Sequence, residues 1–198
     1  MDNSRLFIAN LSKGKIGHDK ANLLGSLLVT QFQLAAMRRA GQPEDERRDF
    51  FLFIDEFQNF TTDAFASLLA EARKYRLCLI LSHQYVDQLS PEIRQAVFGN
   101  AGTMMTFRIG HTDAELLAKE FANTFIPAQF VELDRYQVFT RLLENGIAST
   151  PFPAKTLPAL GVSKNLRQNL CSQRRYSSKR VLIEARIQRW LQNAPSLV

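Results

Sequence analysis

Two adjacent carboxylates, Asp55 and Glu56, are the residues of this sequence whose types and position are best suited to chemistry. They follow an apolar run, Phe51 to Ile54, that is rich in aromatic and β-branched residues. Such a run predicts a strand buried on both faces, as in a parallel sheet. The acids then stand at the carboxyl end of the strand, which is where open α/β sheets bind their ligands.

At that edge the two acids can divide the work of nucleotide hydrolysis. Asp55 can hold the coordination shell of Mg²⁺, while Glu56 orients or deprotonates a water for attack on a γ-phosphate. This is the pattern of a Walker B motif with a catalytic glutamate. The alternative is an acidic pair that only caps the next helix.

Gln84 and Arg73 are two further candidates near the next apolar strand, which is expected over Leu77 to Leu81. A glutamine after that strand can hydrogen-bond a γ-phosphate and the attacking water, or it can be a turn residue, and the residues alone leave both open. Arg73 lies near the end of a helix expected over Ala64 to Tyr75, where a solvated cation also favours the helix terminus.

The loop from Ala9 to Ile16 nearly matches a phosphate-binding P-loop, with Gly14 and Lys15 in place. Its hydroxyl position holds Ile16, whereas a P-loop needs Ser or Thr there to ligate magnesium. A P-loop also needs a helix that starts at once, and Gly17-His18-Asp19 intervenes. We therefore expect a structural loop between a short strand, Arg5 to Leu11, and a long, mostly buried helix.

The remaining pattern alternates strand and helix along the chain. We expect helices over 21–40, 64–75, 91–98 and 112–121, and strands over 51–54, 77–81 and 102–109. This order predicts an α/β fold with a parallel sheet. Glu144-Asn145-Gly146 adds a hairpin bordering that sheet, and a Pro-rich stretch, 151–158, ends the domain.

Composition points to one globular domain with a tail, because 45% of the 198 residues are hydrophobic and 22% are charged. The sequence contains neither an 18-residue apolar run nor a basic-then-apolar leader, so we expect a cytoplasmic chain. Cys78 and Cys171 have no metal or redox spacing. The three histidines form no paired-ligand pattern either.

The C-terminal segment carries the whole charge imbalance. The net charge is +6, and the segment from Lys164 to Trp190 holds eight Lys or Arg against the single acid Glu184, or +7. Such a segment suits phosphate backbones or an acidic protein face, but a solvated tail without a partner has the same composition. An amphipathic helix is expected over 179–191. The candidate nucleic-acid contacts are Arg174, Arg175, Lys179 and Arg180.

The order of motifs is recognisable as a whole. LSKGKIG, FFLFIDEFQNF, ARKYRLCLILSHQYVDQL and GNAGTMMTFRIGHTDAELLAKEF are followed by the hairpin and a TLP segment. This order resembles the carboxyl-terminal half of HerA/FtsK-type motor ATPases, and most closely the TraD/TraG-like type IV secretion coupling proteins of conjugation. The resemblance covers nearly the whole chain and is strongest from Phe50 to Phe121.

The resemblance implies a partial RecA-like ATPase domain over 1–158 and a basic tail with an amphipathic helix over 159–198. The domain would be a parallel sheet flanked by helices, with an edge β-hairpin. It implies ATP and Mg²⁺ as cofactors, a hexameric ring as the assembly, and DNA as the partner that the ring pumps. By position, Asp55 corresponds to the magnesium-site acid, Glu56 to the catalytic base and Gln84 to the γ-phosphate sensor. Arg73 corresponds to the arginine finger that enters the neighbouring subunit's site, a role suited to a permanently charged planar group.

Two family features lie upstream of the part that this sequence matches, namely the P-loop and the membrane anchor. We therefore expect weak nucleotide binding by the chain alone, and a separate upstream chain that supplies the Walker A half. Contact with the inner membrane would come only through such partners. The family also places its P-loop strand between the sensor strand and the strand expected over 102–109. Without that strand we expect a gap or an unpaired apolar edge.

Three functions remain open from the sequence. The leading hypothesis is a truncated or split module of a DNA-translocating ATPase that contributes Walker B and sensor residues. The alternative is a non-enzymatic module that binds DNA or an acidic protein through its basic tail. The third is a remnant without function.

Overall fold

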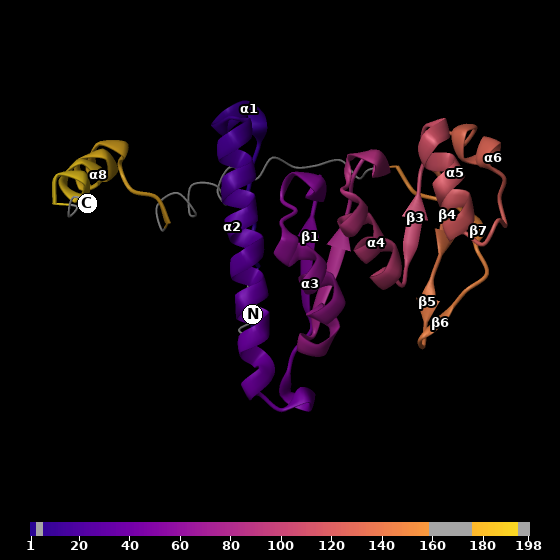
Figure 1. Ribbon diagram of the computed structural model, residues 1–198, viewed down its shortest axis with the longest axis horizontal. Helices are drawn as coiled ribbons and strands as arrows, with labels where there is room; N and C mark the ends of the chain where they lie inside the picture. Colours follow the sequence, from indigo (N-terminus) through magenta and orange to yellow (C-terminus); the bar gives the residue numbers. More distant parts are fainter. Residues whose placement is uncertain (3–5, 159–175, 194–198) are drawn as a thin grey trace. The chain divides into compact units, whose positions relative to one another are not determined.

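The computed structural model describes residues 1–2, 6–158 and 176–193. The chain divides into two units, 1–157 and 158–198, and each is described by itself. Figure 1 shows the helices and strands of both.

The larger unit begins with helices and a parallel strand pair and ends with small antiparallel sheets. Its helices are α1 (Lys13–Ile16), α2 (His18–Met37), α3 (Asp63–Glu71), α4 (Pro91–Asn100), α5 (His111–Glu120) and α6 (Pro127–Val131). Its strands are β1 (Phe50–Ile54), β2 (Leu77–Leu81), β3 (Met104–Thr106), β4 (Gln137–Arg141), β5 (Leu143–Glu144), β6 (Ile147–Ala148) and β7 (Phe152–Lys155). The expected α/β composition is thus present. The expected strand over 5–11 is wrong, because residues 6–11 enter no ladder.

The parallel pair β1–β2 is the part of the expected parallel sheet that the structure contains. Its register sets Phe50 opposite Leu77 and Ile54 opposite Leu81. The third expected strand, β3, instead pairs antiparallel with β4, and β4 pairs antiparallel with β7. The described strands therefore form separate sheets, with an interruption between β2 and β3. Among the described residues, β2 and β3 each have one edge without a strand partner.

The predicted hairpin turn is confirmed at β5 and β6, which pair antiparallel across Asn145 and Gly146. The pair is a two-stranded sheet of its own and does not border the parallel pair β1–β2. Both turn residues have positive φ, 51° and 81°. That conformation is the one a two-residue turn of the primed type requires, and Asn-Gly adopts it readily.

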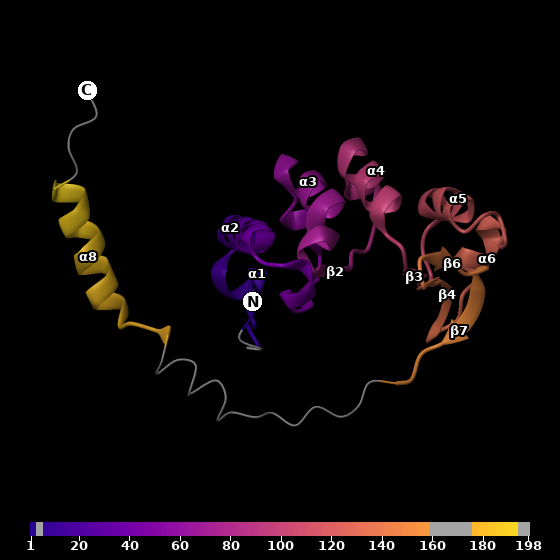
Figure 2. The same cartoon turned by 90° about the horizontal axis from the view of Figure 1, so that it is seen from below.

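One face of the β1–β2 pair is covered and the other is open. Phe50, Leu52 and Ile54 pack in a core to which α2, α3 and α4 all contribute, and Figure 2 shows these helices side by side. The opposite face, here called the open face, consists of Phe51, Phe53, Cys78 and Ile80. Phe51 is 58% exposed and Phe53 is 73% exposed. The prediction of a strand buried on both faces is therefore wrong, because no described segment covers the second face.

A buried arginine joins the end of α2 to the entry of β2. Arg39 is 2% exposed, and its guanidinium donates to Tyr75 O at 2.8 Å and pairs with Asp2 at 2.6 Å. Arg47, which lies between α2 and β1, donates to Lys74 O at 2.6 Å. The two guanidinium groups satisfy carbonyls at the end of the 3-10 turn Ala72–Tyr75, which helical geometry leaves without partners.

The smaller unit contains helix α8 (Arg180–Asn193), close to the helix expected over 179–191. Residues 176–192 are all exposed within the structure. Arg180 donates to Glu184 one turn later at 2.7 Å. Across the described parts of both units, we find no helix with the length and apolar character needed to traverse a bilayer.

The packing of α2 on the loop after β1 predicts a specific sensitivity at Gly25. A Cβ at Gly25 would clash with the ring of Phe60, so Gly25→Ala should force the ring aside and destabilise the protein by about 1–3 kcal/mol. Gly99, also helical, has open space at the same position. Gly99→Ala should leave the stability unchanged or raise it by up to about 1 kcal/mol. Urea unfolding of both variants measures the difference, and equal effects would contradict the contact.

Candidate functional site

The candidate site forms where the two parallel strands end together. Because Ile54 lies opposite Leu81, the segments that follow both strands leave the sheet side by side. Backbone hydrogen bonds continue the pairing past the strands, from Ser82 N to Ile54 O and from Phe57 N to Ser82 O, each at 3.1 Å. The register thereby brings Asp55 and Glu56 to the residues after Leu81.

Asp55 is an exposed carboxylate with a hydroxyl neighbour. Ser82 donates through Oγ to Asp55 Oδ1 at 2.6 Å. This contact joins the ends of β1 and β2 and orients the carboxylate. An exposed carboxylate beside a hydroxyl is the kind of oxygen donor set that Mg²⁺ accepts together with water and phosphate oxygens.

Glu56 is held at both carboxylate oxygens by amide groups. Gln84 donates to Oε1 at 2.5 Å and Gln58 donates to Oε2 at 2.6 Å. The backbone of Glu56 is left-handed, with φ 51° and ψ 46°. A non-glycine residue in this region is strained and persists only where its surroundings enforce it, which is a frequent property of functional sites.

Three of the four predicted catalytic residues therefore lie in one cluster: Asp55, Glu56 and Gln84. Gln58 and Ser82 complete the cluster and were not predicted as site residues. The sequence could have indicated Gln58 as a site residue, because it lies two residues after Glu56. It could also have indicated Ser82, which is the first residue after β2 and so follows the register to a position opposite Asp55.

Arg73, the fourth predicted residue, lies elsewhere. It belongs to the 3-10 turn Ala72–Tyr75, which precedes β2, whereas Gln84 follows β2. The five residues of β2 separate the two ends by roughly 15 Å. Arg73 is exposed and does not reach the Glu56 cluster of its own chain. A role in a neighbouring subunit's site stays a prediction.

The loop from Ala9 to Ile16 has a geometry unlike that of a phosphate cradle. Residues 13–16 close into α1, and the amides of Lys15, Ile16 and Gly17 donate to carbonyls of Ser12 and Lys13 at 2.9–3.2 Å. A phosphate loop must direct such amides at its ligand. Lys13 donates instead to Asn59 Oδ1 at 2.9 Å, which ties this loop to the turn after Glu56. The backbone amides at 15–17 are therefore engaged within their own segment, and the loop at 9–16 is not arranged as a phosphate-binding loop.

Within the described segments, no group of three or more His, Cys, Asp or Glu residues is placed to hold a metal ion. Burial raises the pKa of the Cys78 thiol above its ordinary value, and the nearby Asp49 carboxylate adds to the rise. A raised pKa lowers the fraction of the nucleophilic thiolate. His83 packs edge-on against Phe57, with ring centroids 5.2 Å apart.

The predicted nucleic-acid residues fall partly outside the described structure. Arg174 and Arg175 lie outside the described residues. Lys179 and Arg180 are exposed at the start of α8, and Arg180 already pairs with Glu184.

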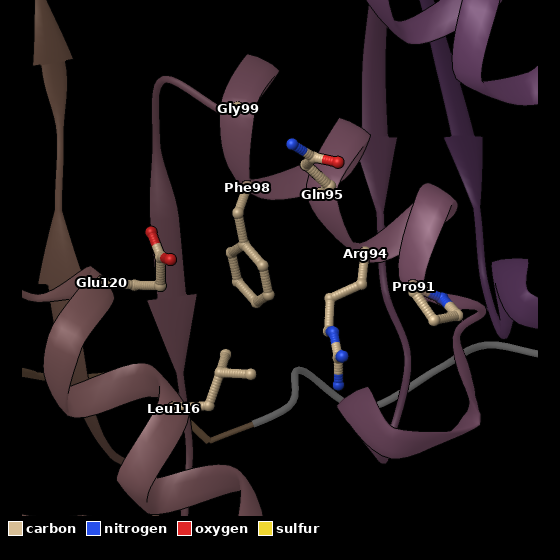
Figure 3. A pocket seen from close by; sticks show the side chains of 7 residues that line it. All are labelled: Pro91, Arg94, Gln95, Phe98, Gly99, Leu116 and Glu120. Carbon is tan, nitrogen blue, oxygen red and sulfur yellow. The ribbon is translucent and has the colours of Figure 1, made fainter.

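A pocket of about 450 Å³ lies between α4 and α5, away from the carboxylate cluster. Phe98 and Leu116 point toward one another across it, with Arg94 and Glu120 at its sides (Figure 3). None of its lining residues belongs to the cluster around Glu56. The interruption between β2 and β3 is thus accompanied by a space between the helices that follow each strand.

The strained backbone at Glu56 predicts an inverted preference between glycine and alanine. Both Glu56→Gly and Glu56→Ala remove the carboxylate, but only glycine adopts φ 51° without strain. Glu56→Gly should therefore be more stable than Glu56→Ala by about 1 kcal/mol. At Glu115, inside α5, alanine should be the more stable by a similar amount. Denaturant unfolding of the four variants tests the inversion, and an alanine advantage at Glu56 would contradict the geometry.

Comparison with known proteins identifies the family of the chain. Residues 6–133 match the family described as the type IV secretion-system coupling protein DNA-binding domain. No curated protein matches the chain at a significant level.

Two solved structures share features of the fold. VirB4 of Thermoanaerobacter pseudethanolicus is similar over 74% of this chain and 40% of its own, with a TM-score of 0.52 and 17% identity. The bacterial conjugative coupling protein TrwBdeltaN70 matches over 65% of this chain and 36% of its own, with a TM-score of 0.48 and 15% identity. The chain thus spans about two fifths of the length of these relatives. Since the family match covers well over half of the sequence, the chain belongs to the type IV secretion-system coupling protein DNA-binding domain family.

Proposed function

We propose that this chain is the Walker B and sensor part of a DNA-translocating ATPase module in type IV secretion. The observation that carries the proposal is the convergence of Asp55, Glu56 and Gln84 where β1 and β2 end. An acid for Mg²⁺, a base for water and an amide for the γ-phosphate are the parts that phosphoryl transfer to water requires.

Each side chain has a definite task in this proposal. Asp55, oriented by Ser82, holds the water shell of the metal. Glu56 accepts the proton of the attacking water, and one of its two amide contacts must open to leave a carboxylate oxygen available. Gln84 is suited to that exchange because its amide can turn from Glu56 to a phosphate oxygen. When bound, Mg²⁺ and ATP supply the neutralising charge and the transferred phosphoryl group.

The rest of the site has to come from another polypeptide or another part of a longer chain. The amides at 15–17 are engaged within their own chain, so phosphates need a different loop. The unpaired edges of β2 and β3 leave room for an additional strand, and the open face with Phe51 and Phe53 leaves room for a covering layer. These features support a partial domain that is completed by a Walker A half.

The proposal extends, by resemblance to the family, to the assembly and its location. A hexameric ring would bring Arg73 of one subunit to the Glu56 cluster of the next, which is consistent with the distance between them within one chain. DNA is the partner named in the family's description. We propose a cytoplasmic position at the inner membrane, reached through partners that carry a membrane anchor.

ATP turnover tests whether the nucleotide site is shared between this chain and a Walker A half. The isolated chain should hydrolyse ATP no faster than buffer, because the phosphate grip is missing. Addition of a polypeptide carrying the GxxxxGK[ST] half of a coupling protein should produce magnesium-dependent hydrolysis. Glu56→Gln should lower that restored rate at least about 100-fold, as expected for loss of a general base.

The matched control is Glu115→Gln, an exposed glutamate of α5, which should leave the restored rate unchanged. If the isolated chain hydrolyses ATP with magnesium and Glu56→Gln abolishes that hydrolysis, the proposal of a shared site is contradicted. The loop at 9–16 would then be the candidate for binding the phosphates. A restored rate that survives Glu56→Gln would remove Glu56 from the role of base.

A second candidate function is DNA binding by the basic tail. The observation that favours it is the excess of +7 between Lys164 and Trp190, of which Lys179, Arg186 and Arg189 are exposed in the described part. Cations that contact phosphates release counterions, so affinity must fall as salt rises.

A salt titration with duplex DNA measures this function. The slope of log affinity against log salt should become shallower by about 0.9 for each of Lys179→Gln and Arg186→Gln, if each cation neutralises one phosphate. Lys119→Gln, on the exposed surface of α5, should leave the slope unchanged. Affinity that is undetectable at low salt, or indifferent to salt, would exclude the tail as a phosphate binder.

A further inference from the structure

The segment after β2 carries Gln84 out of the sheet and passes through a short 3-10 turn, Val86–Gln88, before it reaches α4. Gln84 and Tyr85 are exposed, whereas Val86 is 4% exposed. A buried backbone N–H needs an acceptor, because burial without one costs free energy. The partner of Val86 N therefore decides how firmly this segment is held.

That partner is a carboxylate from another part of the fold. Val86 N donates to Asp113 Oδ2 at 3.0 Å, and the contact is buried. Asp113 is 6% exposed and belongs to the first turn of α5, the helix that follows β3. A buried carboxylate needs hydrogen-bond donors, and the N-terminal end of a helix favours a negative charge. The first turn of α5 is thus a suitable place to keep an acceptor at this depth.

The hydrogen bond crosses the interruption between β2 and β3. These strands belong to different sheets, and Val86 and Asp113 come from the segments that follow them. Helix α5 packs in a core that it shares with α6 and β4, whereas Leu89, three residues after Val86, lies in the core beneath β1 and β2. Figure 2 shows α4 and α5 next to one another. The contact therefore attaches the segment after Gln84 to the core of α5.

Gln84 is thereby held from both sides along the chain. Before it, the His83 ring packs edge-on against Phe57, which is 0% exposed, with ring centroids 5.2 Å apart. After it, Tyr85 is extended, with φ −134° and ψ 122°, and leads directly to Val86. Because only Tyr85 separates Gln84 from Val86, a displacement of the Val86 backbone moves Gln84 as well.

The side chain of Gln84 has a narrow target. Its Nε2 donates to Glu56 Oε1 at 2.5 Å, and such a contact weakens steeply when its geometry changes. We infer that Asp113 is a positioning residue for Gln84: it holds Val86 N and thereby keeps the Gln84 amide at Glu56. The effect on hydrolysis rests on the proposed function, whereas the placement of Gln84 does not depend on it.

Nuclear magnetic resonance of the full chain tests the placement. Asp113→Ala removes the acceptor, so the Val86 amide hydrogen should exchange with solvent at least about tenfold faster. The signals of the Gln84 side-chain amide should move toward their position in Glu56→Ala, where the contact is absent. Asp113→Asn keeps a carbonyl oxygen for Val86 N, so it should return the exchange rate and the Gln84 signals most of the way to the wild type.

The matched control is Leu117→Val, at a buried position of the same helix. It should lower the stability of the chain because it removes buried apolar volume. It leaves the acceptor for Val86 N in place, so the Gln84 signals should stay where they are in the wild type. Circular dichroism verifies that each variant keeps its helical content.

ATP hydrolysis in the presence of the Walker A half tests the consequence for the reaction. Asp113→Ala should lower kcat at least about fivefold and change KM by less than about twofold, because it disturbs the alignment of a group that acts in the transition state. Asp113→Asn should recover most of the wild-type kcat, and Leu117→Val should retain it.

The outcomes separate this inference from the proposed function. If the wild type gives no hydrolysis with the Walker A half, the proposed function fails, and the resonance measurements alone decide whether Asp113 positions Gln84. Unchanged Gln84 signals in Asp113→Ala would overturn the inference. So would a kcat that Leu117→Val lowers as much as Asp113→Ala does, since a loss of stability would then explain both.

Discussion

The parallel register of β1 and β2 is the constraint on which the candidate site depends. Ile54 lies opposite Leu81, and two backbone hydrogen bonds extend the pairing to Ser82 and Phe57. A shift of one residue would turn every side chain to the other face and separate Glu56 from Gln84. The same register fixes which side chains enter the core, so catalytic geometry and packing come from one set of contacts.

The helices of the larger unit cover only one face of the β1–β2 pair. α2, α3 and α4 all contribute to the core on one face, and Arg39 secures the turn that leads into β2. The opposite face and the leucines Leu23, Leu27 and Leu34 of α2 are exposed, and β2 and β3 each keep an unpaired edge among the described residues. Apolar surface of this kind is typical of a chain that meets partners. The proposed Walker A half would meet the unpaired edges and the open face.

Much of the local structure could be predicted. The helical spacing after Ala21, the apolar run before Asp55 and the Asn-Gly turn each determine an element within a few residues of its observed bounds. Local patterns failed where a distant segment decides the outcome. The segment 6–11 is apolar like a strand yet has no ladder partner, and β3 pairs with β4 rather than joining the sheet of β1 and β2.

The sequence by itself determined the chemistry that is available: adjacent acids after an apolar strand, a glutamine after the next strand, and a basic tail. Residue type and short-range periodicity carry that information, because they depend on neighbours in the chain. Only the tertiary structure decided that Gln58 holds Glu56, that Arg73 stands at the far end of β2, and that Phe51 and Phe53 face outward. Those outcomes depend on which remote segments pack on each face, and a periodic pattern shows that a face is apolar without showing what covers it.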